Sequence, residues 1–289
     1  MRGAMTSRRV LRIGVLPLAL FYVFFFLLPA LQFLRSSLYD SSESTDDGAS
    51  LTNYRRALGS ESVLDSLATT LGIALVTAVV SLLLAYLIAY HVVRGPAWLS
   101  RLIMVAALSS LFASAIARAL GWRVLLADSG PLNDLLLALG VVDEPVRLIN
   151  NTIAVTVGMV HVQVPIIMLA LIPVIEAVPR EMERAAYGLG ESRWRTFLRV
   201  HLPLTWMNAV PIGLIAVMAT AAYFTTPALL GGGRVLVLPI LIQQAAQVLF
   251  DYATAATLAA ILSIVIVAIA CVVLVFTRWR RTIRERGHA

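Results

Sequence analysis

The sequence contains no lysine and only one cysteine, and 13% of its 289 residues are charged. All 23 basic residues are therefore arginine, and the formal charge is +7. The lone Cys271 lies in an apolar run, which excludes an intrachain disulfide and argues against redox chemistry. Apolar residues make up 60% of the chain, too many for a soluble domain of this length. Several uncharged runs exceed the roughly 18 residues that cross a bilayer. The sequence therefore predicts an all-α integral membrane protein.

The sequence also lacks the motifs of common catalytic and nucleotide-binding sites. Gly231 to Gly233 form a glycine run, but the Lys-Ser/Thr pair of a phosphate-binding loop does not follow it. The four histidines show no paired spacing of metal ligands. We therefore expect this chain to have no catalytic residue, no metal and no cofactor of its own. The arginines flank the apolar runs, so membrane insertion explains them better than nucleic acid does, and no nucleic-acid partner is expected.

Six apolar stretches are predicted to cross the membrane. The third extends beyond a short uncharged run only if Arg118 and Arg123 snorkel to the interface. A further uncharged stretch, 235–250, contains Pro239 and three glutamines that are costly in lipid, so we expect an external or re-entrant helix there. The predicted spans cover approximately residues 13–34, 66–93, 102–126, 148–175, 204–230 and 252–277.

The distribution of arginine predicts the orientation of these spans. Segments assigned to the cytoplasm hold 16 arginines and 5 acids, and segments assigned to the outside hold 7 arginines and 11 acids. This excess follows the positive-inside rule for six spans in the cell inner membrane, with both termini cytoplasmic. The first apolar run is too long for a signal peptide and has no small-residue cleavage site after it, so we expect it to be retained.

The predicted cytoplasmic loop, 176–203, is the one long charged segment between two apolar blocks in the second half of the chain. Pro179 is placed to open a first helix, Gly188 and Gly190 to end it, and Ser192 to cap a second helix. A charged helix–turn–helix of this kind is either a docking platform for a partner or an amphipathic connector lying on lipid headgroups. The local pattern alone leaves both interpretations open.

The spacing within this loop carries a family resemblance. Gly190 follows the Ala185-Ala186 pair after three residues, and nine residues later come Val200, Leu202 and Pro203. This arrangement resembles the "EAA" loop of permease subunits of ATP-binding-cassette (ABC) importers with the type I fold. The family's glutamate position holds Arg184, and Glu183 stands one residue earlier, about 100° around the helix, where it could still offer a carboxylate. The resemblance implies that the following residues form an ATPase-docking element: Glu183, Arg184, Ala185, Ala186, Gly190, Val200, Leu202 and Pro203.

The resemblance extends to most of the chain. The segments ARALGWRVLLADSGPLNDLLLALG, GMVHVQVPIIML and TTPALLGGGR are similar to the spermidine/putrescine-type branch of these permeases. This implies a single permease domain, 1–289, that pairs as a heterodimer with a second permease. It also implies an external solute-binding protein and two cytoplasmic ATPase subunits, which would bind ATP and Mg. The expected cargo is a polyamine or a related small solute. Similar permeases in this branch handle iron, sulfate, thiamine or phosphonates.

Polar residues at membrane depth are candidates for a translocation pathway, because they are costly in lipid unless paired or hydrated. The alternative is that they form hydrogen bonds between helices, and we expect Arg118 and Trp122 to anchor at the outer headgroups. An ion-coupled secondary transporter is a competing function, but it calls for intramembrane carboxylates and an internal repeat. The predicted spans contain no Asp or Glu in their cores. A non-transporting scaffold is a third interpretation. The pathway candidates are His161, Gln163, Tyr223, Thr225 and Thr226.

Overall fold

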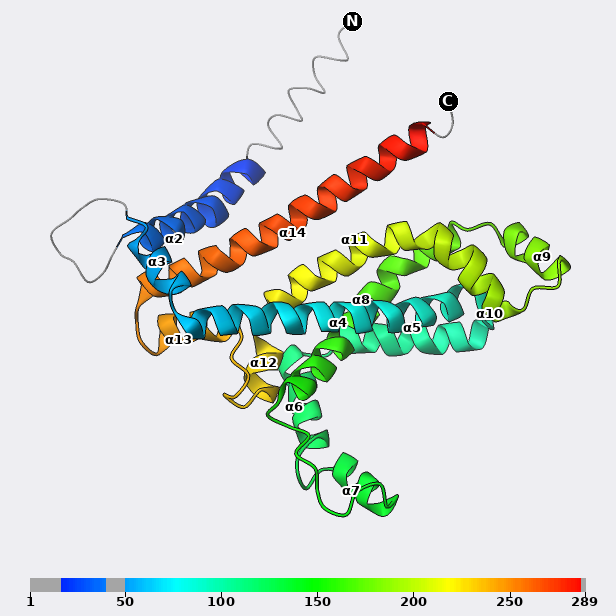
Figure 1. The fold of residues 1–289 in the computed structure, drawn as a ribbon, viewed down its shortest axis with the longest axis horizontal. Helices are drawn as coiled ribbons and strands as arrows, with labels where there is room; N and C mark the ends of the chain where they lie inside the picture. Colours follow the sequence, from blue (N-terminus) through cyan, green and yellow to red (C-terminus); the bar gives the residue numbers. More distant parts are fainter. Residues whose placement is uncertain (1–16, 40–49, 287–289) are drawn as a thin grey trace, which may run out of the picture. The chain divides into compact units, whose positions relative to one another are not determined.

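The computed structural model describes residues 17–39 and 50–286, and all regular structure within those ranges is helical (Figure 1). The predicted all-α class is confirmed for this part of the chain. The predicted cytoplasmic N-terminal segment and the acidic stretch 40–49 lie outside the described residues. The chain divides into two compact units, one of residues 1–64 with 241–261 and the other of residues 65–240 with 262–289. Each unit is described by itself.

The first unit contains a helical segment, Pro17–Leu38, that is long and apolar enough to cross a membrane. It includes a π-helical turn, η1 (Val23–Leu27), followed by α2 (Leu28–Leu38). The π turn precedes a proline in the first turn of α2, which has no N–H to donate to the preceding turn. Helix α3 (Thr52–Leu58) packs on α2, where Ser37 Oγ lies 2.8 Å from Tyr54 Oη. Thr257 Oγ1, in the first part of α14 (Tyr252–Arg286), donates to Ser37 O at 3.3 Å.

The second unit is a bundle around α8 (Thr152–Glu176), which packs against α5, α6, α11 and α12. Asn151 caps α8 by accepting from Ala154 N at 2.8 Å. The long helix α4 (Glu61–Arg94) turns a stripe of small residues inward, which allows close packing in a membrane bundle. The other elements of this unit are α5 (Ala97–Phe112), α6 (Ala115–Leu125), α7 (Pro131–Ala138), α9 (Arg180–Gly188), α10 (Arg193–Thr196), η2 (Phe197–His201), α11 (Leu202–Ala221) and α12 (Thr225–Leu230). Most of α13 (Leu238–Gln247) belongs to the first unit.

A hydrophobic cluster joins the start of α8 to α12 and the segment that follows it. Val155 and Met159 of α8 are buried there with Leu230 of α12. Gly158 makes this contact possible, because a Cβ at this position would overlap the side chains of Leu230 and Thr226. The absence of a side chain at Gly158 therefore sets how closely α12 approaches α8.

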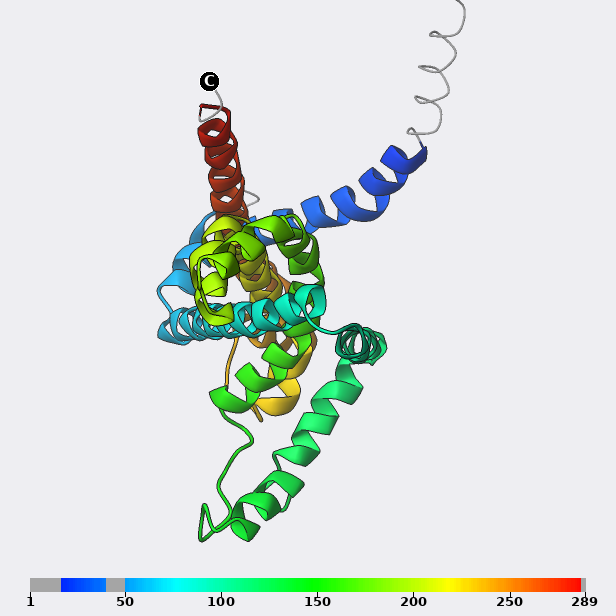
Figure 2. The ribbon, with the colours of Figure 1, turned by 90° about the vertical axis from the view of Figure 1, so that its right-hand side faces the viewer.

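The third predicted span, 102–126, is wrong as one continuous helix. The chain bends by 106° between α5 and α6, and Figure 2 shows the two helices diverging. Ala113 and Ser114 are extended at the break, both with ψ of 139°. Arg118 Nη1 donates to Ser110 O at 2.6 Å, so its guanidinium satisfies one of the carbonyls left free where α5 ends. The bent pair counts as a sixth candidate span beside five straight ones only if the two helices are taken together.

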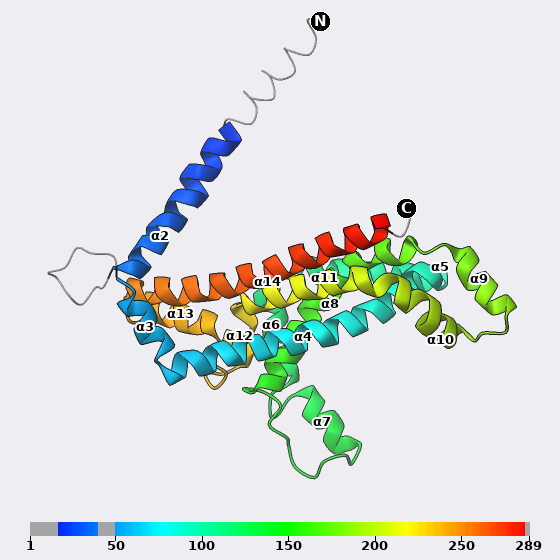
Figure 3. The same cartoon turned by 45° about the horizontal axis from the view of Figure 1, so that its top comes forward.

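The fifth predicted span, 204–230, also has different bounds. A helical segment runs from Arg193 to Ala221 through Pro203, and α12 begins separately after a short turn (Figure 3). The π-helical turn η2 precedes Pro203 and accommodates the missing N–H without breaking the helix. Pro227 lies in the first turn of α12, where an N–H would have no intrahelical acceptor. Within the stretch 235–250, α13 has 10 residues and is too short to cross a bilayer.

Candidate functional site

The charged loop folds as two helices joined by a glycine turn, as its sequence predicts. Helix α9 has Pro179 as its N-cap residue, and Glu181 and Glu183 lie in its first turn. At the other end Gly190 has φ of +85° and donates to Tyr187 O at 3.0 Å. The N–H of the next residue, Glu191, donates to Ala186 O at 3.1 Å. These two bonds form a Schellman motif, in which the left-handed position strongly favours glycine.

The second half of the loop is anchored on α4 by aromatic side chains. Ser192 caps α10 by accepting from Arg195 N at 3.4 Å. The ring of Trp194 stacks on Phe197 with centroids 5.3 Å apart. Phe197 is buried and meets the ring of Tyr90 edge-on, with centroids 5.1 Å apart. This contact fixes α10 beside the end of α4.

A buried carboxylate connects α9 to two other elements. Glu183 is 7% exposed, and its Oε1 accepts from Arg94 Nε at 2.7 Å and also contacts His201 Nε2. Arg94, the last residue of α4, donates through Nη2 to Val178 O at 2.6 Å. His201 ends η2, and its side chain is fully buried. Glu183 therefore links α9 with the end of α4 and the start of α11, and its carboxylate is engaged within the chain rather than offered at the surface.

Sequence reasoning named Glu183 but not Arg94 or His201. These residues lie 89 and 18 positions away from it, so no local spacing signals the contact. The other predicted docking residues lie on the loop with different exposures. Arg184, Ala185, Gly190, Leu202 and Pro203 are exposed, Ala186 is buried and Val200 is half-buried.

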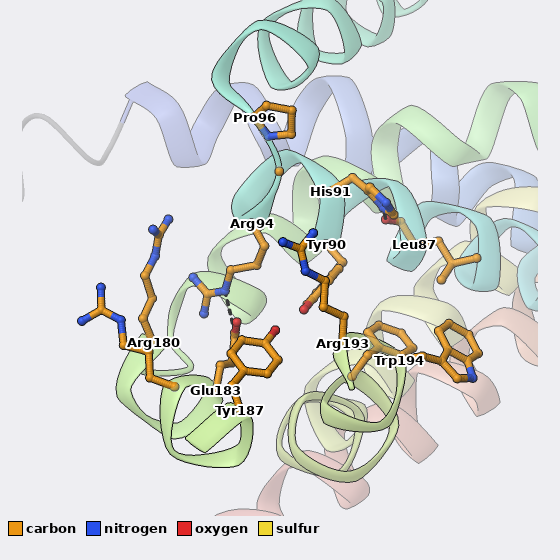
Figure 4. A pocket seen from close by; sticks show the side chains of 13 residues that line it. Leu87, Tyr90, His91, Arg94, Pro96, Arg180, Glu183, Tyr187, Arg193 and Trp194 are labelled. Atoms are coloured by element: carbon orange, nitrogen blue, oxygen red, sulfur yellow. Dashed lines mark hydrogen bonds and ion pairs between the residues drawn. The ribbon is translucent and has the colours of Figure 1, made fainter. Parts of the chain in front are cut away.

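A cavity of about 540 Å³ opens between the end of α4, α9 and α10 (Figure 4). Its walls combine arginine, tyrosine and tryptophan side chains. Figure 4 shows Arg94 directed at Glu183, and Arg193 extending from α10 toward the end of α4. The lining residues are Leu87, Tyr90, His91, Arg94, Gly95, Pro96, Arg180, Glu183, Arg184, Tyr187, Arg193, Trp194 and Phe197.

The predicted pathway residues take part in separate contacts in the bundle. His161 Nδ1 accepts from Trp122 Nε1 at 2.8 Å, and its Nε2 lies 3.3 Å from Ser110 Oγ. Trp122 and Arg118 are half-buried against this group, and the expectation that they anchor at the outer headgroups stays a prediction. A histidine and a tryptophan from α8 and α6 thus stabilise the bent helix pair.

Gln163 is buried and ties α8 to α11. Its Nε2 donates to Thr220 Oγ1 at 2.7 Å and to Ala216 O at 3.0 Å. These are the hydrogen bonds between helices that we expect if Gln163 holds the bundle together instead of lining a pathway. Thr226 is buried, and Thr225 and Tyr223 are half-buried at the start of α12 and in the turn before it. Their role in solute passage stays a prediction.

Comparison with known proteins finds relatives that align with most of this chain. No protein-family model matches the sequence. The chain is 27% identical over 214 residues to the spermidine/putrescine transport system permease protein PotB of Salmonella typhimurium, covering 73% of this chain and 74% of that protein. The Escherichia coli protein of the same name is 26% identical over 214 residues, covering 73% of this chain and 78% of the other.

Solved structures share the fold over nearly the whole chain. A chain of a bacterial ABC transporter involved in the import of the acidic polysaccharide alginate superposes with a TM-score of 0.77 and 14% identity, covering 96% of this chain and 97% of that one. A chain of such a transporter in complex with an alginate pentasaccharide-bound periplasmic protein gives a TM-score of 0.79 at 15% identity, with 98% of both chains covered. The chain therefore shares the fold of these ABC-transporter chains. In sequence it is homologous to the PotB permeases over most of its length.

Proposed function

We propose that this chain is the permease subunit through which an ATP-driven importer moves polyamines, or a closely related small solute, across the cell inner membrane. The alignment with spermidine/putrescine permeases over 73% of the chain carries this proposal. The binding protein in the related alginate complex supports an external solute-binding partner here. The positive-inside distribution of arginine supports cytoplasmic termini and a cytoplasmic position for α9 and α10.

ATP hydrolysis in this proposal belongs to separate cytoplasmic subunits, which bind ATP and Mg. A second permease completes the transmembrane pathway as a heterodimer with this chain. The helices α9 and α10 are the docking element for one ATPase subunit. Because Glu183 connects α9 to Arg94 of α4 and His201 at the start of α11, a displacement of α9 acts directly on two membrane helices. This linkage gives a physical route from the ATPase to the bundle.

The test is ATP hydrolysis by the reconstituted complex, measured as its binding protein is loaded with candidate solutes. Spermidine and putrescine are expected to stimulate hydrolysis, while sulfate, ferric iron, thiamine and a phosphonate serve as competing candidates. Stimulation by one of these competitors alone would replace the polyamine assignment but keep the importer class. Solute uptake that needs no ATP and collapses with the ion gradient would instead establish a secondary transporter.

A further inference from the structure

The cavity between α4, α9 and α10 carries an excess of positive charge. Four arginines line it, and the lining contains one carboxylate, that of Glu183. This carboxylate already accepts from Arg94 and contacts His201, so the charge of Arg94 is compensated inside the chain. Arg180 donates to the carbonyl of Val93 at 3.3 Å, and it forms no ion pair with any side chain that the structure describes.

Two of the lining arginines are available to an incoming group. Among the side chains that the structure describes, those of 17–39 and 50–278, neither Arg184 nor Arg193 has an ion-pair or hydrogen-bond partner. Both residues are exposed, and they enter the cavity from different helices, α9 and α10. Guanidinium groups bind carboxylates through paired, charge-assisted hydrogen bonds. The chemistry that matches this cavity is therefore an anion with paired oxygen atoms, either a carboxylate or a phosphate.

The walls of the cavity fit a protein segment. Tyr90, Tyr187 and Trp194 line it, and arginine and aromatic residues are the types enriched at the centres of protein interfaces. At the turn after α9, Leu189 is 87% exposed. Trp194 is stacked on Phe197, which is itself held against α4, so this ring is fixed as a wall of the cavity rather than free to enter lipid. These features favour a protein partner over a lipid headgroup.

We propose that an Asp or Glu side chain of the cytoplasmic ATPase subunit enters this cavity and pairs with Arg184 and Arg193. The inference rests on the proposed function, and it assigns the polarity of the docking contact. This chain supplies the cations, the ATPase supplies the anion, and Glu183 is reserved for holding α9 to the bundle.

The experiment uses the full complex and the double variant Arg184→Glu/Arg193→Glu. The control is Arg101→Glu, which makes one such charge reversal at an exposed position of α5, outside α9, α10 and the cavity lining. The double variant is expected to weaken ATPase association by at least about tenfold, since each like-charge contact replaces a favourable pair. The control is expected to change association less than about twofold. Single Asp/Glu→Arg changes on the ATPase surface are then screened, and one of them must restore association to the double variant and weaken association of the wild type.

Folding of the double variant is checked by its detergent-stable monodispersity and helical circular dichroism. If it misfolds, the neutral pair Arg184→Gln/Arg193→Gln takes its place, and the ATPase surface is screened with Asp→Asn and Glu→Gln changes instead. Association equal to that of the control would overturn the proposal. The proposal would also be overturned if the double variant associates like the wild type but its activity no longer differs between phosphatidylglycerol and phosphatidylcholine vesicles. That result assigns the cavity to a lipid headgroup. A wild-type chain that retains no ATPase subunit would overturn the proposed function as well.

Discussion

Replacing Glu183 by alanine should release α9 from the bundle. In the wild type, the Glu183 and Arg94 side chains are 9% and 10% exposed, and their Oε1 and Nε atoms are 2.7 Å apart. Removing one partner of a buried ion pair leaves the other charge uncompensated and costs about 3–5 kcal/mol. Arg94 keeps its bond to the carbonyl of Val178, which places the expected loss at the lower end, about 3 kcal/mol.

Amide hydrogen exchange of α9 in the purified chain measures this loss locally. A decrease of about 3 kcal/mol in the opening free energy corresponds to exchange faster by roughly 100-fold, since about 1.4 kcal/mol is a factor of ten. The matched control is Glu191→Ala, which removes the pair with Arg199 at 2.6 Å. The Arg199 side chain is 70% exposed, so this control is expected to accelerate exchange by less than about fivefold. Unchanged exchange in Glu183→Ala would refute the argument that the buried pair holds α9.

Three further substitutions test other contacts. Gly190→Ala should destabilise the end of α9 by about 1 kcal/mol through its φ of +85°, with Gly190→Asn costing less; exchange of the α9 amides measures both, and equal rates in all three proteins would show that the turn relaxes. Gly158→Ala should lower thermal stability by about 1–3 kcal/mol, because the added Cβ overlaps α12. The control Gly72→Ala should leave stability unchanged, because a Cβ there meets no atom within 4 Å. Equal melting temperatures of the two variants would contradict this packing. Gln163→Leu should lower the stability of the chain by about 1 kcal/mol, and it should be largely neutral in a Thr220→Val background. Solute uptake that falls while stability is unchanged would instead place Gln163 in the solute pathway.

Local rules were enough to predict both ends of α9 and the start of α10. Gly190 in a left-handed conformation and Ser192 as a cap follow from residue type and position alone. Most of the long apolar helices were also predictable, because a long uncharged run rarely forms anything other than a candidate membrane span. The break at Ala113–Ser114 was not predictable, since neither residue is proline or glycine. At this break Arg118 donates to a carbonyl of the preceding helix, a contact that local sequence rules do not predict.

The internal role of Glu183 depends on tertiary structure in the same way. Its contacts come from the end of α4 and from the last residue of η2, which only folding brings together. The predicted start of the fifth span, directly after Pro203, differs from the structure for another reason. A proline usually starts or breaks a helix, but a π-helical turn before it removes the need for its N–H. The helix therefore continues into the charged loop, where η2 joins α10 to α11.

Uptake of spermidine by proteoliposomes that contain the complete complex tests the central claim most directly. The vesicles are prepared with the ATPase subunits accessible, with binding protein on the opposite side, and with or without dissipation of ion gradients. The permease assignment predicts uptake that requires ATP, requires this chain and persists when the gradients are removed. Uptake that continues without ATP and stops when the gradients are dissipated would contradict it.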